Sequence, residues 1–327
     1  MCSLRFIDLF AGIGGFRLGF ERLGFECVYS CEIDEKAANV YESNFGESPL
    51  GDITKIRGPE LPDFEILLAG FSCQPFSAAG ERRGFSDKER GTLFFDILRI
   101  VKAKQPKVIV LENVKNLLTI DKGNSFKLIK ELLEKENYTV AYKVLNAKDF
   151  GVAQNRERLI IVGTLKGIDN FNFNNFHKMD SIKLKDILKK DGEMEYLSTD
   201  DYTIIESPKV QKTGIIFAGY MNDKNPRKRG VDQSKVHLSR VHKQFNRIYS
   251  DEGIICTLMA QESAGRYWVL TSDGVRKLTR EECKHLMGFP EDFKIYGNQK
   301  DYYRFIGNSI VVPMVVEIAK EVKRILH

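Results

Sequence analysis

A thiol and a carboxyl group stand at the ends of two predicted strands, where they could share one reactive pocket. Cys73 follows the apolar run 64–69, and Glu112 follows the apolar run 108–111. The carboxyl ends of parallel strands meet at one edge of a sheet, where open α/β folds bind their ligands. A cysteine there can act as a nucleophile, and a carboxyl group as an acid or a base. An inert buried thiol, the usual state of a lone cysteine, would explain Cys73 equally well.

A glycine-rich segment, Phe10–Gly15 (FAGIGG), lies between the predicted strand 4–10 and the predicted helix 14–23. Glycine has no Cβ, so a loop of this kind lets a cofactor approach the backbone closely. Arg17 stands where the third glycine of a dinucleotide fingerprint would fall. The segment therefore indicates a nucleotide-like cofactor but disfavours a nicotinamide one.

Two acidic residues follow the next predicted strands and could bind a nucleoside. Glu32 comes after the strand 26–30 and is placed to accept hydrogen bonds from ribose hydroxyls. Asp52, in the segment Gly51–Ile53, could accept a hydrogen bond from an adenine amino group. A helix N-cap or an exposed turn would account for either acid without a ligand.

The elements that must position these residues alternate along the first half of the chain. Strands are predicted at 4–10, 26–30, 64–69, 108–111, 138–145 and 158–164, and helices at 14–23, 34–44, 92–104 and 124–135. Strands that alternate with helices form parallel βαβ units. We therefore predict a doubly wound, mostly parallel α/β sheet.

The region from 175 to 273 has poor periodicity and carries two basic runs, at 224–229 and 239–247. A solvated surface explains such runs, and contact with nucleic acid explains them equally well. Aromatic residues lie near these charges, namely Phe245, Tyr249, Tyr267 and Trp268. They suit either contact with nucleic acid or a small core.

Helical spacing returns at 278–287 and 309–326. We predict three parts: a catalytic domain at 1–174, a smaller, irregular, β-rich domain at 175–273, and a return to the catalytic domain at 274–327.

The composition of the 327-residue chain sets broad limits: 43% hydrophobic, 29% charged and a formal net charge of +5. This charge permits a polyanionic partner without requiring one. The six cysteines show no CxxC spacing, so neither a zinc site nor a disulfide framework is indicated. The chain has no run of about eighteen apolar residues and no leader-like start. We expect an unexported protein with reduced thiols that acts in the cytoplasm.

Five motifs resemble, in order and spacing, those of the bacterial DNA (cytosine-5)-methyltransferases. They are Asp8–Gly15 (DLFAGIGG), Gly70–Ser77 (GFSCQPFS), Glu112–Val114 (ENV), Gln154–Arg158 (QNRER) and Gly307–Ser309 (GNS). The resemblance covers nearly the whole chain outside about 170–270. It implies the Rossmann-like fold of methyltransferases that use S-adenosyl-L-methionine, with 175–273 as the target-recognition domain.

The resemblance also implies the chemistry. Cys73 would add to C6 of cytosine and thereby activate C5. Glu112 would bond the N3 and amino edge of the base, while Arg158 and Arg156 would face its O2 or the neighbouring phosphate. The methyl donor would be S-adenosyl-L-methionine, the product S-adenosyl-L-homocysteine, and no metal would be required. A stacked base cannot present C6, so the cytosine must be flipped out of double-stranded DNA.

Further residues take their expected roles from the same resemblance. The cofactor contacts would be Phe10, Gly12, Gly14, Glu32, Ile33, Asp52, Ile53, Leu93 and, near the methionine part, Asn308. The stretch 77–90 resembles the loop that closes over the flipped base. The expected DNA contacts are Ser77, Arg82 and Arg83 in that loop, Thr257 in a short family marker, and Arg227, Arg229 and Arg240 on phosphates.

Two departures and two alternatives accompany the resemblance. Ser72 stands where the family usually has proline, so we expect the loop around Cys73 to be less stiff, and 87–91 is about one residue longer than the common form. The alternatives are methylation of transfer RNA, the substrate of one branch of the family, and a catalytically silent DNA-binding relative. We expect a monomer that acts either as the modification enzyme of a restriction-modification system or as an orphan methylase. A restriction endonuclease of the same system is a candidate partner.

Overall fold

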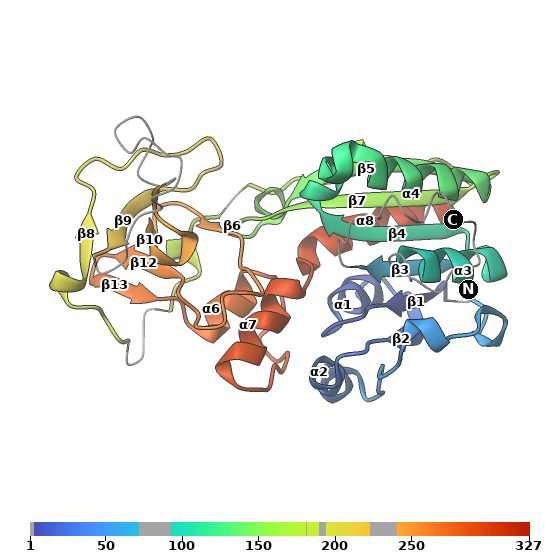
Figure 1. The fold of residues 1–327 in the computed structure, drawn as a ribbon, viewed down its shortest axis with the longest axis horizontal. Coiled ribbons are helices and arrows are strands. Elements are labelled where there is room, and N and C mark those ends of the chain that lie inside the picture. Colours follow the sequence, from blue (N-terminus) through green and yellow to red (C-terminus); the bar gives the residue numbers. More distant parts are fainter. Residues whose placement is uncertain (1–2, 72–92, 181, 190–193, 223–240) are drawn as a thin grey trace. The chain divides into compact units, whose positions relative to one another are not determined.

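The structure, a computed structural model, describes residues 3–71, 93–180, 182–189, 194–222 and 241–327 (Figure 1). The chain divides into two compact units. Unit 1 consists of Met1–Leu145, Glu157–His177 and Val312–His327, and unit 2 of Asn146–Arg156 and Lys178–Val311. Each unit is thus assembled from segments that are far apart in the sequence.

A six-stranded sheet in the order β2-β1-β3-β4-β7-β5 forms the centre of unit 1. Its strands are β1 (Arg5–Leu9), β2 (Glu26–Cys31), β3 (Ile66–Gly70), β4 (Val108–Val114), β5 (Tyr138–Asn146) and β7 (Glu157–Leu165). β1 pairs in parallel with β2 and β3, and β3 pairs in parallel with β4. β7 pairs antiparallel with β4. The predicted doubly wound, mostly parallel sheet is confirmed.

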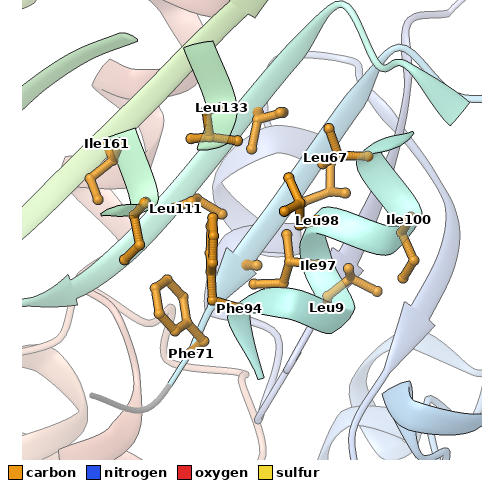
Figure 2. Close-up of a cluster of buried hydrophobic side chains, with 14 of the residues drawn as sticks. Leu9, Leu67, Phe71, Phe94, Ile97, Leu98, Ile100, Leu111, Leu133 and Ile161 are labelled. Carbon is orange, nitrogen blue, oxygen red and sulfur yellow. The ribbon is translucent and has the colours of Figure 1, made fainter. Parts of the chain in front are cut away.

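One face of this sheet is covered by α3 (Phe94–Lys104) and α4 (Asn124–Lys135). Alternate strand residues point to the same face, which explains why apolar residues two apart along β1, β3 and β4 enter one cluster. Figure 2 shows this cluster, which includes Leu9, Leu67, Phe71, Phe94, Ile97, Leu98, Ile100, Leu111, Leu133 and Ile161. Each fully buried leucine or isoleucine side chain contributes about 1.5–3 kcal/mol. The cluster therefore fixes β3 and β4 side by side.

The opposite face carries α1 (Gly15–Glu21) and α8 (Val312–Leu326). Phe6, whose side chain points away from α3, contacts Phe20 of α1 at a ring distance of 5.5 Å. α1 packs directly on α8. A Cβ on Gly19 would lie 2.4 Å from Cγ1 of Val315, so only glycine permits this approach of the two helices.

The helix α2 (Glu35–Phe45) is capped at both ends, by Asp34 before it and Gly46 after it. The Asp34 side chain accepts hydrogen bonds from the backbone N–H groups of Lys36 and Ala37, which caps the first turn. Gly46 ends the helix in the left-handed conformation, with φ of 78°.

Unit 2 contains a five-stranded sheet in the order β13-β12-β10-β9-β8. The strands are β8 (Tyr202–Ile204), β9 (Phe217–Met221), β10 (Arg247–Ser250), β12 (Trp268–Thr271) and β13 (Gly274–Lys277). A two-stranded sheet joins β6 (Gln154–Asn155) to β11 (Ile255–Cys256), and the helices are α6 (Arg280–His285) and α7 (Gln299–Asn308). Trp268 belongs to a small core with Ile248 and Val275. The expected small β-rich part is confirmed.

The two units divide the chain at points that differ from the predicted boundaries. α6 and α7 belong to unit 2, so the chain returns to unit 1 at Val312 instead of 274. Nε2 of Gln154 donates to the carbonyl of Leu286 at 2.8 Å, directly after α6. A Cβ on Gly307 of α7 would lie 2.1 Å from the backbone nitrogen of Ala260. These contacts tie both helices to unit 2. None of the helices in the described residues is long and apolar enough to cross a membrane.

Asp8 places a carboxyl group in the middle of unit 1, on the α1 face of β1. Its side chain is fully buried, and neither oxygen makes a regular hydrogen bond to a described residue. Burial raises the pKa of Asp8 to about 8, although the nearby backbone N–H and charge of Arg17 favour the ionised form. We infer that Asp8 keeps its proton in the folded chain at neutral pH.

Gly19→Ala should lower the free energy of unfolding by about 1–3 kcal/mol, because the new methyl group overpacks the contact with Val315. The change would stabilise an isolated helix, so the sign of the effect is diagnostic. Val315→Ala removes the opposing methyl groups and should make the double variant more stable than the sum of the two single effects predicts. Apparent free energies from urea denaturation test this, and strictly additive effects would contradict the contact.

Asp8 should make stability depend on pH. Its pKa is about 8 in the folded chain and near 3.8 when exposed, so between these values the folded state holds more protons than the unfolded state. The free energy of unfolding therefore falls as pH rises through this window, by at most about 1.4 kcal/mol per unit. Asp8→Asn removes this contribution. Urea denaturation at pH 6 and 7.5 should show a steeper loss for the parent than for the variant, and equal slopes would contradict the inference.

Candidate active site

The ends of β3 and β4 bring the two predicted catalytic segments together. Gly70, the last residue of β3, pairs with Glu112 of β4, and a Cβ on Gly70 would lie 3.6 Å from Oε2 of Glu112. Cys73 lies outside the described residues, three positions beyond Gly70. The described part of this segment therefore ends at Phe71, one residue beyond β3.

Glu112 forms an ion pair with Arg158 across the antiparallel seam between β4 and β7. Nε of Arg158 lies 2.8 Å from Oε1 of Glu112, and the two side chains are only 12% and 14% exposed. The pairing of Val114 with Arg158 places Glu112 two residues away on the same face, which explains the contact. The structure thus brings these two predicted catalytic residues together.

Arg158 follows Glu157 directly in the sequence, but these two side chains form no ion pair with each other in the described residues. Glu157 pairs instead with Lys115, at 3.1 Å, and both side chains are exposed. Arg158 contacts Glu157 only at its backbone carbonyl, to which Nη1 donates at 2.8 Å, while Nε lies against Oε1 of Glu112. The side chain of Arg158 is therefore turned to Glu112.

Asn113 has a role that its place in the sequence did not predict. Its side chain is buried, and its Nδ2 donates to the backbone carbonyl of Phe71 at 2.9 Å. Its Oδ1 accepts from the backbone N–H of Val114 at 2.8 Å. Asn113 therefore anchors the chain two residues before Cys73. A polar residue at the end of an otherwise apolar strand was the available signal.

The glycine-rich loop after β1 adopts a conformation that only particular residues allow. Phe10, Gly12 and Gly14 have φ values of 58°, 55° and 92°, all in the left-handed region. A Cβ on Gly14 would lie 2.2 Å from the Phe45 ring, whereas a Cβ on Gly12 would meet nothing within 4 Å. Gly14 is thus required by packing within the unit, while Gly12 borders open space.

Glu32 links the end of β2 to this loop. Its Oε2 accepts from the backbone N–H of Gly12 and its Oε1 from that of Asp34, both at 2.8 Å. The following residue, Ile33, is 70% exposed despite its apolar side chain. A carboxylate, a glycine amide and an exposed apolar group therefore lie together at the carboxyl ends of β1 and β2.

Asp52 caps a short 3₁₀ turn, which is the role as a helix N-cap that the sequence allowed without a ligand. Its Oδ1 accepts from the backbone N–H of Thr54 at 2.9 Å. A carboxylate offers about four acceptor positions, so capping is compatible with a ligand contact. The side chain of Ile53 is buried in the core cluster, and Leu93 packs on the same cluster at the start of α3.

Arg156 lies in unit 2 and does not share the environment of Arg158. Its buried guanidinium donates from Nη1 to the carbonyl of Leu258 at 2.8 Å, and from Nη2 to those of Gly307 and Ser309 at 2.8 and 2.6 Å. Arg156 thus ties together three segments of unit 2. The shared motif of Arg156 and Arg158 does not distinguish this structural task from contact with the base.

The remaining predicted residues fall into two groups. In unit 2, the Thr257 hydroxyl donates to the carbonyl of Asn155 at 2.8 Å, and Asn308 is exposed at the end of α7. The second group lies outside the described residues: Cys73, Ser77, Arg82, Arg83, Arg227, Arg229 and Arg240.

The four cysteines in the described residues are poor nucleophiles. Burial raises the pKa of Cys27 and Cys31 to about 12 and that of Cys256 to about 11, and it also raises the pKa of Cys283. Because the thiolate is the reactive form, these thiols are unreactive at neutral pH. Among the same residues, no group of three His, Cys, Asp or Glu side chains could hold a metal ion.

Known proteins match the chain over almost its whole length. Two curated relatives are the Type II methyltransferase M.HhaI of Haemophilus parahaemolyticus and the Type II methyltransferase M.HaeII of Haemophilus aegyptius. They are 40% and 43% identical to this chain, each alignment covers 98% of it, and the alignments cover 94% and 92% of the relatives.

Solved structures show the same fold. The Dnmt2 methyltransferase of S. pombe superimposes with a TM-score of 0.72 at 20% identity, over 98% of this chain and 99% of that one. The Entamoeba histolytica methyltransferase EhMeth gives a TM-score of 0.68 at 17% identity, over 100% of both chains. A family model described as C-5 cytosine-specific DNA methylase matches residues 4–324. This chain belongs to the C-5 cytosine-specific DNA methylase family.

Proposed function

We propose that this chain methylates C5 of a cytosine flipped out of a short, specific sequence in duplex DNA, with Cys73 as the nucleophile. Its family consists of cytosine-specific DNA methylases. The observation that carries the residue assignment is the Glu112–Arg158 pair at the end of β4, beside the end of β3 that leads to Cys73.

C5 of cytosine is a weak nucleophile, and the side chains at this edge of the sheet can increase its nucleophilicity. The Cys73 thiolate would form a bond to C6, which moves the electron pair of the C5–C6 double bond to C5 and toward N3. After methylation, loss of the C5 proton and departure of the sulfur would restore the double bond. The thiol is therefore regenerated in each cycle.

Glu112 would bond the N3 and amino edge of the base, where negative charge develops when sulfur adds to C6. Arg158 holds one carboxyl oxygen, so the rotation of the Glu112 side chain is restricted before the base arrives. We assign Glu112 as the acid at N3 and Arg158 as a residue that positions it and faces the O2 side of the base.

S-adenosyl-L-methionine, the methyl donor of the family, fits the residues at the ends of β1 and β2. Glycine at position 12 borders open space, Glu32 is oriented by two backbone N–H groups, and Ile33 exposes an apolar side chain suited to a base. When bound, it supplies an electrophilic methyl group. The residues that would hold it are Phe10, Gly12, Gly14, Glu32, Ile33, Asp52, Ile53, Leu93 and Asn308.

DNA contacts are proposed for the loop after Cys73 and for unit 2. Ser77, Arg82 and Arg83 would help to close the loop over the base, while Arg227, Arg229 and Arg240 would bind phosphates. The bonds of Arg156 and Thr257 to backbone carbonyls support a positioning role for both in the recognition unit.

The setting of the reaction is proposed from the names of the relatives. M.HhaI and M.HaeII are Type II methyltransferases. We therefore propose that this chain is the modification enzyme of a restriction-modification system, acting as a monomer in the cytoplasm, with a restriction endonuclease as its partner in that system.

Cys73→Ala should abolish methyl transfer because it removes the thiol that we propose adds to C6. Binding of S-adenosyl-L-methionine, measured by calorimetry, should stay within about twofold, because a thiol-to-methyl change removes no cofactor contact. DNA containing 5-fluorocytosine should trap a covalent adduct with the parent protein and none with the variant.

Cys27→Ala is the matched control, since burial keeps that thiol protonated and it should retain adduct formation. Loss of cofactor affinity in Cys73→Ala would make Cys73 a structural residue. Parent protein that traps no adduct would indicate a silent relative, and transfer to transfer RNA in preference to duplex DNA would indicate the RNA alternative.

Glu112→Gln should lower kcat by a factor of roughly 10²–10⁴, since it removes proton donation to N3. The affinity for S-adenosyl-L-methionine should not change. Arg158→Lys keeps a positive charge but cannot hold Glu112 in the same geometry, so its effect should be smaller in size and similar in kind. Single-turnover methylation rates measure both. Glu157→Gln, which alters an exposed pair in the same strand, should leave the rate unchanged. Equal loss in all three variants would argue for general destabilisation.

A further inference from the structure

A buried carboxylate in unit 2 holds one arginine in a fixed orientation. Glu262 is 2% exposed at its side chain and contacts Arg266 through both oxygens. Nε of Arg266 donates to Oε1 at 3.0 Å and Nη2 donates to Oε2 at 3.1 Å. A buried carboxylate requires such a partner, because an unpaired buried charge is strongly destabilising. Arg266 nevertheless remains 37% exposed.

The backbone around this pair is also fixed. Oε1 of Glu262 accepts from the backbone N–H groups of Ala264 and Arg266, at 3.1 and 3.3 Å. Gly265 has a φ of 63°, and a Cβ on it would lie 2.2 Å from the Tyr303 ring. The turn 262–266 is therefore closed by the carboxylate on one side and packed against α7 on the other.

An aromatic ring supports the guanidinium from a second direction. The central carbon of the Arg266 guanidinium lies 4.3 Å from the centroid of the Phe245 ring. Phe245 is held in turn, because Nε1 of Trp268 donates to its backbone carbonyl at 3.1 Å. We refer to Phe245, Glu262, Arg266 and Trp268 as the Arg266 cluster. Its carboxylate and its ring together fix both the position and the plane of the guanidinium.

This arrangement leaves a defined edge of the guanidinium for a ligand. Glu262 takes the edge formed by Nε and Nη2, and among the described residues Nη1 makes no hydrogen bond. The remaining fork consists of the hydrogens on Nη1 and the second hydrogen on Nη2. Two parallel donors of this kind match the O6 and N7 acceptors that guanine presents in the major groove.

Neighbouring charges suit a nucleic acid in particular. Lys243 lies 5.6 Å from the same Phe245 ring, and Lys277 lies 5.3 Å from the Trp268 ring. Both lysines are exposed, so they can contact phosphates while Arg266 contacts a base edge. A free carboxylate or phosphate can also accept two parallel hydrogen bonds from this fork, but the exposed lysines nearby suit the phosphates of a nucleic acid and leave Arg266 for a base edge.

We propose that Arg266 is a specificity-determining residue that reads one guanine of the recognition sequence through O6 and N7, and that Glu262 is its positioning residue. The proposal rests on the proposed function as a DNA methylase. It adds that the recognition sequence contains a guanine which the enzyme reads by a bidentate contact.

The test uses a duplex that carries the methylated sequence, defined first by bisulfite sequencing of DNA modified by the parent protein. Each guanine is replaced in turn by 7-deazaguanine, which lacks the N7 acceptor but pairs normally. One replacement should lower kcat/KM of the parent protein by about tenfold or more. Arg266→Lys keeps the positive charge but loses the two parallel donors. For this variant, 7-deazaguanine at that position should lower kcat/KM little further. At the other guanines, the replacement should change kcat/KM by the same factor as in the parent protein.

Glu262→Gln and Arg280→Lys complete the design. Glu262→Gln should weaken discrimination at the same guanine, because the fork is no longer held in place. Arg280→Lys is the matched control: Arg280 also lies over an aromatic ring, at 5.2 Å from Tyr302, and is exposed in the same unit. It should discriminate as the parent does. Adduct formation with 5-fluorocytosine DNA and the Tm show that each variant is folded and active.

The outcomes separate the alternatives. If Arg266→Lys lowers kcat/KM by one common factor on every duplex, the residue contacts a phosphate or only stabilises the turn, and the proposal is wrong. A recognition sequence without guanine would also overturn it. Absence of any DNA methylation by the parent protein would overturn the proposed function together with this inference, whereas normal methylation with unchanged discrimination would overturn the inference alone.

Discussion

A carboxylate that is shielded from water needs a positive partner, and the pair of Glu112 and Arg158 meets this need where β4 meets β7. The pair requires the antiparallel register of these strands, because only that register puts the two side chains on one face two residues apart. The same strand end carries Asn113, which holds the carbonyl of Phe71. Glu112 and the backbone at Phe71 are therefore both held by one short piece of β4.

Unit 2 also contains a buried carboxylate that is paired with an arginine, but this pair stabilises the fold. Arg276 and Glu282 form a second pair with two hydrogen bonds, at 2.9 and 2.8 Å, and both side chains are at most 3% exposed. Although burial alone would raise the pKa of Glu282, its hydrogen bonds from Arg276 hold it below the usual value. This pair is sealed, so its role is structural. Arg266 has an equally buried carboxylate partner but reaches solvent, and that difference separates an arginine that holds a fold from one that can meet a ligand.

Much of the fold was predictable because its signals are local. The apolar runs at 64–69 and 108–111 predicted the central strands, and Gly12 and Gly14 predicted the loop after β1. β4 continues through Glu112 to Val114, beyond the apolar run, because β7 pairs with it, and no local pattern contains that partner. Pairing between distant strands thus sets where a strand ends.

Side-chain roles were less predictable than elements. Arg156 and Arg158 belong to one motif, yet one bonds three carbonyls of unit 2 and the other pairs with Glu112, because the chain passes from one unit to the other between them. Glu262 and Arg266 have the spacing of an ordinary exposed helix pair. Their segment is a turn packed against Tyr303, which lies 37 residues beyond Arg266 in the sequence. Burial of this kind depends on tertiary contacts that residue types alone do not encode.

The contact between Gly19 and Val315 has a consequence for synthesis of the protein. α1 is among the first elements to leave the ribosome, but the helix that covers it, α8, follows only after the whole of unit 2. Domains usually fold as units during translation, so unit 2 can fold while the sheet of unit 1 still exposes an apolar face. A nascent chain that stops before Val312 would therefore carry a complete unit 2 beside an unfinished unit 1, whose sheet still exposes the apolar face that α8 covers.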